Sequence, residues 1–325
     1  MKDGRVSKRW RRLEYPGEGK TGCGDDGLEQ AVAMKLRLVY AIVCAVAVCC
    51  AGVAVGAEAG WRPLFNGKDL AGWETYLGAP LPTSVVPGAE RDATGNYIQV
   101  LGVGNDPLKC FTVVEVDGKP AIRLSGEGFG TLSALESFSN YHVRLQFKWG
   151  AKKWLPGSEN KPRGSGLLYH GHGKHGDGDE GKRWMPHQQF QIQEGNTGEY
   201  VAVGDTAADI TARKGDDKKF VYDPAAPVLI FCAKTPAQNR CLRSVSYEKK
   251  GEWNTIDLIC VGDTATQVVN GHVVLRLTGS RKVAGDGFEP LTSGRLLLQM
   301  EGSEVFFREI EIKQVTEVPA EFVGK

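Results

Sequence analysis

Short runs in which apolar and polar residues alternate constrain the fold of this chain more than any other feature. In the run His142–Trp149 every second residue is apolar, which is the pattern of a strand buried on one side. Asn270-Gly271 stands between two apolar runs and favours a two-residue β-hairpin. Such runs recur between glycine-containing turns, and no segment has the period of a long amphipathic helix. The sequence therefore predicts an all-β sandwich or barrel.

The N-terminal part differs in composition from the rest of the chain. Residues 34–57 begin with a basic segment, continue with an uncharged apolar run from Leu38 to Val55, and end in small residues. This is the pattern of a cleavable signal peptide, so we expect a secreted or periplasmic protein. An uncleaved membrane anchor is the alternative, because about 18 apolar residues can span a bilayer. We expect residues 1–33 to be a disordered or mis-assigned extension and residues 58–325 to form a single domain.

The charge balance and the cysteines limit the partners and the compartment. Lys and Arg number 40 against 39 Asp and Glu, so the chain has no basic field for nucleic acid. In an oxidising compartment the four cysteines of the expected domain could form two disulfides, and four buried thiols are the alternative. These cysteines are Cys110, Cys232, Cys241 and Cys260.

A loop between two strand-like runs gathers most of the groups that bind metals or transfer protons. The loop and its edges carry four of the six histidines, several carboxylates and, at the end of the second run, Glu194. Loops held by rigid strands are where binding and catalysis usually occur. Oxygen ligands suit calcium and imidazoles suit transition metals, so a divalent ion, calcium or a transition metal, is an option and no cofactor is assigned. The candidate ligands are His172, His175, Asp177 and Asp179, and the alternative is that they are solvated.

Four motifs in a fixed order carry a resemblance to a known family. They are LFNGKDLAGW at 64–73, SGLLYH at 165–170, FQIQEGNTGEY at 190–200, and EWNT at 252–255 followed by the Asn-Gly hairpin. Together they resemble the 3-keto-disaccharide hydrolase-like family from about residue 61 to residue 313. The resemblance implies a concanavalin A-like jelly roll, a secreted or periplasmic protein, and action on oxidised sugars.

The chain departs from this family at two positions. Related sequences often have Asp where this chain has Gly164, and Glu where it has Gln189. A carboxylate role at these two positions is therefore not carried over to this chain.

The chemistry implied by the family needs a base beside a ketone. In a 3-keto-glycoside the carbonyl acidifies the C2–H bond, and removal of that proton lets the C1 substituent leave by β-elimination. The site must supply a base, a group that stabilises the enolate, and a donor for the leaving oxygen. We predict Glu194 and His170 as the catalytic residues, because each ends a strand and each can accept a proton. The alternatives are that Glu194 caps a turn and that His170 orders the loop.

Several further residues are predicted to bind the sugar. Gln189, Gln191 and Gln193 share one face of a strand and can hydrogen-bond to hydroxyls. Tyr169 and Trp184 offer flat apolar surfaces, and Lys148 could hold an enolate.

The predicted function is cleavage of 3-keto-glycosides by hydrolysis or elimination, with a carbohydrate or 3-keto-sugar as the ligand. A non-catalytic carbohydrate-binding module is the alternative. A conventional two-carboxylate glycosidase, with Glu194 and Glu199 as its acids, is a third reading.

Overall fold

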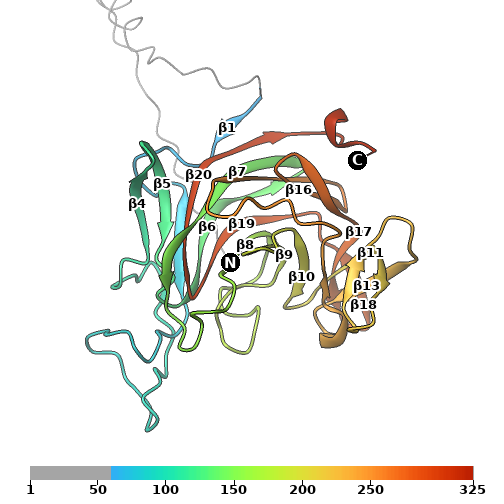
Figure 1. Cartoon of the computed structure of the whole chain (residues 1–325). Coiled ribbons are helices and arrows are strands. Elements are labelled where there is room, and N and C mark those ends of the chain that lie inside the picture. The colour runs from blue at the N-terminus through green and yellow to red at the C-terminus, as the bar shows by residue number, and fades with distance from the viewer. Residues whose placement is uncertain (1–59, 325) are drawn as a thin grey trace, which may run out of the picture. The chain divides into compact units, whose positions relative to one another are not determined.

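The computed structural model describes residues 60–324, which lie within one compact unit. Two antiparallel sheets are stacked on each other, and the smaller sheet lies under the arch of the larger one (Figure 1). The predicted all-β, concanavalin A-like sandwich is therefore confirmed. Among the described residues no helix is long and apolar enough to cross a membrane. The predicted signal segment and the extension at 1–33 lie outside the described residues.

The larger sheet has 12 strands among the described residues. Its central order is β12 (Phe220–Tyr222), β11 (Thr206–Lys214), β17 (His272–Ala284), β16 (Thr264–Val269), β15 (Asn254–Val261), β7 (Tyr141–Lys153), β20 (Ser303–Gln314), β5 (Lys119–Leu124) and β4 (Phe111–Val116). Three shorter strands pair at its margins: β1 (Arg62–Pro63) with β20, β13 (Val228–Cys232) with β11, and β18 (Gly287–Pro290) with β17.

The smaller sheet has eight strands in the described range, and it carries most of the predicted site residues. Its order is β14 (Arg240–Cys241), β10 (Glu199–Val203), β9 (His187–Gln193), β8 (Gly164–Gly171), β19 (Ser293–Glu301), β6 (Phe129–Ser139), β2 (Trp73–Leu77) and β3 (Gly102–Val103). Two 3-10 turns, η1 (Pro236–Gln238) and η2 (Ala320–Phe322), complete the fold.

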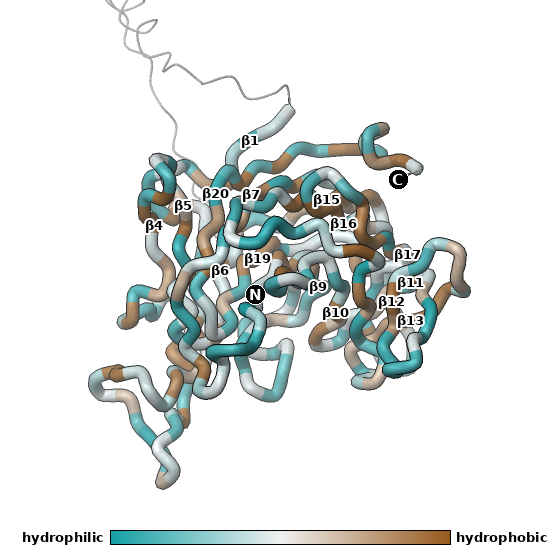
Figure 2. Tube along the Cα trace, in the orientation of Figure 1, coloured by the Kyte–Doolittle hydropathy of each residue, from teal (hydrophilic) through white to brown (hydrophobic). Residues whose placement is uncertain are grey.

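The core lies between the two sheets, and the alternating sequence pattern explains it. Val143, Leu145 and Phe147 of β7 are fully buried. Burial of each such side chain contributes about 1.5–3 kcal/mol to the free energy of folding. Figure 2 shows hydrophobic and hydrophilic residues alternating along the strands. The predicted hairpin joins β16 to β17, and Asn270 and Gly271 have φ angles of 48° and 79°. Positive φ at both central residues is what the favoured two-residue hairpin requires.

The four cysteines are buried and free in the described part of the chain. Burial raises the pKa of Cys110, Cys241 and Cys260 to about 12, so these thiols stay protonated and behave as small apolar side chains. The structure therefore contains buried thiols where the sequence left disulfides open.

Candidate functional site

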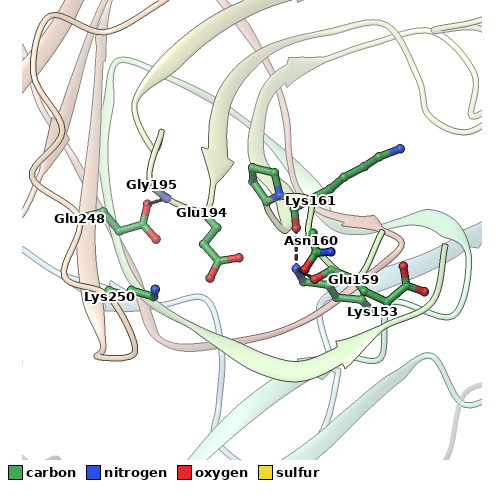
Figure 3. A pocket seen from close by; sticks show the side chains of 9 residues that line it. Lys153, Glu159, Asn160, Lys161, Glu194, Gly195, Glu248 and Lys250 are labelled. Carbon is green, nitrogen blue, oxygen red and sulfur yellow. Dashed lines mark hydrogen bonds between the residues drawn. The ribbon is translucent and has the colours of Figure 1, made fainter. Parts of the chain in front are cut away.

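Glu194 lies at the end of β9, as predicted from the sequence, and lines a cavity of about 360 Å³. We call this cavity the Glu194 pocket. Three segments that are distant in sequence form it: the β7–β8 loop, the β9–β10 turn and a segment that precedes β15 (Figure 3). Its lining residues are Lys153, Glu159, Asn160, Lys161, Pro162, Glu194, Gly195, Glu248 and Lys250.

Arg163 fixes the Glu194 carboxylate in place. The Arg163 guanidinium donates to Glu194 Oε1 at 2.8 Å, and the Arg163 backbone N–H donates to Oε2 at 3.2 Å. Both side chains remain about one-fifth exposed, at 19% for Arg163 and 22% for Glu194. The carboxylate is therefore oriented by a neighbouring cation and still reachable from the pocket.

The other charged groups of the pocket have separate tasks. Glu248 accepts hydrogen bonds from the Gly195 N–H at 2.9 Å and from the Thr197 hydroxyl at 2.8 Å, so it holds the β9–β10 turn. Lys153 donates to two carbonyls of its own loop, those of residues 159 and 161. The Lys250 side chain extends into the pocket toward Glu194 (Figure 3). A carboxylate and an ammonium group thus face a shared cavity.

A second pocket, which we call the Glu199 pocket, lies beside the same turn. Its volume is about 460 Å³, and its lining residues are Gln193, Asn196, Glu199, Lys218, Lys219, Phe220, Pro236, Ala237, Asn239, Arg240 and Leu242. Glu199 is only 2% exposed, and burial raises the pKa of its carboxyl group more than the charges of Arg240 and Arg243 lower it. Sequence reasoning considered Glu199 only as the second acid of a conventional glycosidase. The residues that bury it come from β14 and its surroundings, about 40 positions further along the chain.

The model of a family described as a 3-keto-alpha-glucoside-1,2-lyase-like domain matches residues 60–313. The chain belongs to this family. The resemblance carried by the four sequence motifs is thereby confirmed. A search of curated proteins found no match.

Several solved structures are similar to this lyase-like domain at low sequence identity. A candidate glycosyl hydrolase from Parabacteroides distasonis ATCC 8503 is 17% identical, with 80% of this chain and 98% of that chain covered and a TM-score of 0.43. A protein of unknown function with a galectin-like fold from Bacillus subtilis is 14% identical over 80% and 96% of the two chains, with a TM-score of 0.37. The carbohydrate-binding module CBM66 from Bacillus subtilis is 9% identical over 62% and 91%, with a TM-score of 0.35.

His170 does not share the Glu194 pocket, so the two residues predicted to be catalytic lie apart. In the antiparallel pair β8–β9, Gly164 pairs with Gln193 and Tyr169 with Gln188, so His170 and Glu194 lie at opposite ends. His170 is fully buried beside two tyrosine rings, and burial lowers its pKa to about 4. It is neutral at physiological pH and has no access to a sugar.

Two predicted sugar-binding residues are also placed elsewhere. Tyr169 is fully buried in the core between the sheets and offers no surface to a ligand. Lys148 belongs to the larger sheet, where its ammonium group donates to Asp117 at 2.9 Å and lies 5.9 Å from the Trp253 ring. Both corrections have the same cause, because a strand pattern does not say which sheet or which face a residue joins.

The glutamines share one face of β9, as predicted, but two of them are buried. Gln189 and Gln191 are 4% and 3% exposed. Gln189 donates to Gln299 at 3.0 Å and also to Gln191, so the amides of these residues bond mainly to one another. Gln193 lines the Glu199 pocket, which leaves it the accessible member of the three.

The polar loop at 172–186 packs against the face of the smaller sheet that points away from the core. His172 Nε2 lies 2.9 Å from Asp205 Oδ1, and His175 Nε2 lies 2.9 Å from Glu74 Oε1. Asp179 accepts hydrogen bonds from the Arg183 side chain and backbone. Three of the four candidate metal ligands, His172, His175 and Asp179, therefore each have a separate partner.

The structure does not assemble these side chains into a metal site. Within residues 60–324 no group of three His, Cys, Asp or Glu side chains is placed to hold a metal ion. Asp177 and Trp184 line a wide groove next to the loop, of about 730 Å³. Trp184 is 6% exposed and packs edge-on against Phe129 at 6.0 Å between ring centroids. His172 and His175 dock the loop through Asp205 and Glu74, and Asp179 bonds to Arg183 within it.

Proposed function

We propose that this lyase-like domain cleaves 3-keto-glycosides in the Glu194 pocket, by removing the C2 proton and expelling the C1 substituent. The observation that carries the proposal is the Glu194 carboxylate, oriented by Arg163 and facing the same cavity as Lys250. Membership of a family described by 3-keto-alpha-glucoside-1,2-lyase activity supports the substrate class.

In the proposed reaction Glu194 accepts the proton from C2. The C–H electron pair forms the C2–C3 double bond of an enolate, whose negative oxygen lies where the Lys250 ammonium group stabilises it. The enolate then reforms the ketone, a C1–C2 double bond forms, and the C1–O bond breaks. The proton gained by Glu194 returns to the leaving oxygen. Addition of water across the new double bond completes a net hydrolysis, and release of the unsaturated sugar completes a lyase reaction.

We also propose that the protein works outside the cytoplasm, in the secreted or periplasmic space. Support comes only from the signal-peptide pattern at residues 34–57. Cell fractionation with N-terminal sequencing tests this proposal, and recovery of the protein in the cytoplasmic fraction alone, with the apolar run retained, would contradict it.

The decisive experiment compares a 3-keto disaccharide with its unoxidised parent as substrates. Turnover of the oxidised sugar alone is the expected result. Turnover of the parent alone would favour a conventional glycosidase, and binding without turnover would favour a carbohydrate-binding module.

The Glu194→Gln variant tests the assignment of the base. Loss of a general base lowers turnover by about 10²-fold or more, and we expect that loss here. Glu115→Gln is the matched control, because Glu115 is an exposed carboxylate on β4 and should leave turnover unchanged. A Glu194→Gln variant as active as this control would refute the assignment.

A further inference from the structure

The Glu199 pocket combines the surface types that hold a sugar ring. Phe220 and Leu242 provide apolar walls, Gln193 and Asn239 provide amides, and Glu199 provides a carboxylate. Sugar-binding sites commonly use apolar surfaces for the C–H faces of the ring and a few polar groups for the hydroxyls. None of these residues takes part in the proposed reaction at Glu194.

Glu199 is left without a full set of hydrogen bonds. Its Oε2 atom is buried and accepts no hydrogen bond, and the side chain as a whole is only 3% exposed to solvent. The nearest guanidinium groups are too distant to donate well, at 3.7 Å for Arg240 Nε and 3.8 Å for Arg243 Nη1. A buried carboxylate without donors costs free energy, so this arrangement is explained if a ligand hydroxyl supplies the missing donor.

The pocket also has an excess of positive charge. Lys218, Lys219 and Arg240 line it, against the one carboxylate of Glu199. Lys219 is partly neutralised by Asp217, whose carboxylate lies 3.1 Å from its ammonium group. The Arg240 side chain is 44% exposed and can turn toward an anion. A ligand that carries a carboxylate would therefore be attracted to this rim.

We propose that the Glu199 pocket binds a sugar acid. A ring hydroxyl donates to Glu199, the ring lies against Phe220, and the ligand carboxylate pairs with Lys218 and Arg240. The raised pKa of Glu199 is consistent with a carboxyl group that is desolvated in advance of binding.

The test measures binding of D-glucuronate and D-glucose to the full chain by titration calorimetry and by amide chemical shifts. We expect glucuronate to bind at least about tenfold more tightly than glucose and to shift the signals of residues 218–220 and 239–242. Equal binding of the two sugars, or no binding of glucuronate, would overturn the proposal.

Two variants locate the ligand. Glu199→Gln and Arg240→Gln should each weaken glucuronate binding about tenfold, which is the usual effect of losing a charge-assisted hydrogen bond. The Arg240 side chain is 44% exposed, so its variant keeps the test valid even if the buried Glu199→Gln protein folds poorly. Glu194→Gln is the control and should bind glucuronate as the parent does. Binding that survives both pocket variants would show that the sugar acid binds elsewhere.

Discussion

Glu248 should stabilise the β9–β10 turn measurably. Its Oε2 atom accepts from the Gly195 N–H and from the Thr197 hydroxyl, and its Oε1 atom accepts from the Trp149 indole at 3.0 Å. In Glu248→Gln only one oxygen remains, so the amide group must face at least one of these donors. Loss of one hydrogen bond to a charged group costs about 1.5–3 kcal/mol of unfolding free energy. In a domain of this size that corresponds to a fall in Tm of roughly 3–12 °C.

Urea denaturation of four proteins measures this contribution. Glu248→Gln and Thr197→Val are made singly and together, so that the double-mutant cycle isolates the contact between the two side chains. We expect the double variant to lose less stability than the sum of the single variants. Glu252→Gln is the control, since this neighbouring carboxylate is exposed and should change the unfolding free energy by less than about 0.5 kcal/mol. If Glu248→Gln behaves like this control, or if the cycle is additive, the reasoning about the turn is wrong.

Two further predictions concern carboxylates with shifted pKa values. Burial raises the pKa of Glu199, so its ionised form lowers the stability of the fold at neutral pH, and this cost disappears as the pH falls below the pKa of the unfolded state. Glu199→Gln should therefore gain stability relative to the parent protein as the pH rises from 4 to 8 in urea titrations. A stability difference that does not change with pH would contradict this. Burial alone would raise the pKa of Glu74, but hydrogen bonds from His175 and Arg295 hold this pKa below its usual value. The ionised Glu74 therefore stabilises the fold above about pH 4.5, and this contribution is lost as the pH falls through the lower folded-state pKa. Glu74→Gln should speed amide hydrogen exchange in the 172–186 loop about tenfold at pH 7, with no such difference at pH 3, and unchanged exchange at pH 7 would show that Glu74 does not anchor the loop.

Local patterns in the sequence were sufficient to predict the strands and which residues of a strand share one face. The period-2 run in β7 and the Asn270-Gly271 hairpin follow from rules that involve only neighbouring residues. The shared face of Gln189, Gln191 and Gln193 follows from the same rule, and Phe190 on the opposite face is fully buried in the core.

Pairing between distant segments could not be predicted in the same way. His170 and Glu194 both end strands in the sequence, but the antiparallel register of β8 and β9 places them at opposite edges of the sheet. The burial of Glu199 depends on Arg240 and Arg243, which the pairing of β10 with β14 brings close. The histidines of the 172–186 loop looked available because their partners, Glu74 and Asp205, lie outside the loop.

The β9–β10 turn borders both pockets, with Glu194 and Gly195 on one side and Gln193 and Asn196 on the other. A change of length or sequence in these few positions would reshape two cavities at once, whereas the strands beneath would keep their register. Divergence of specificity among relatives of this chain should therefore concentrate in this short connection rather than in the sheets that carry it.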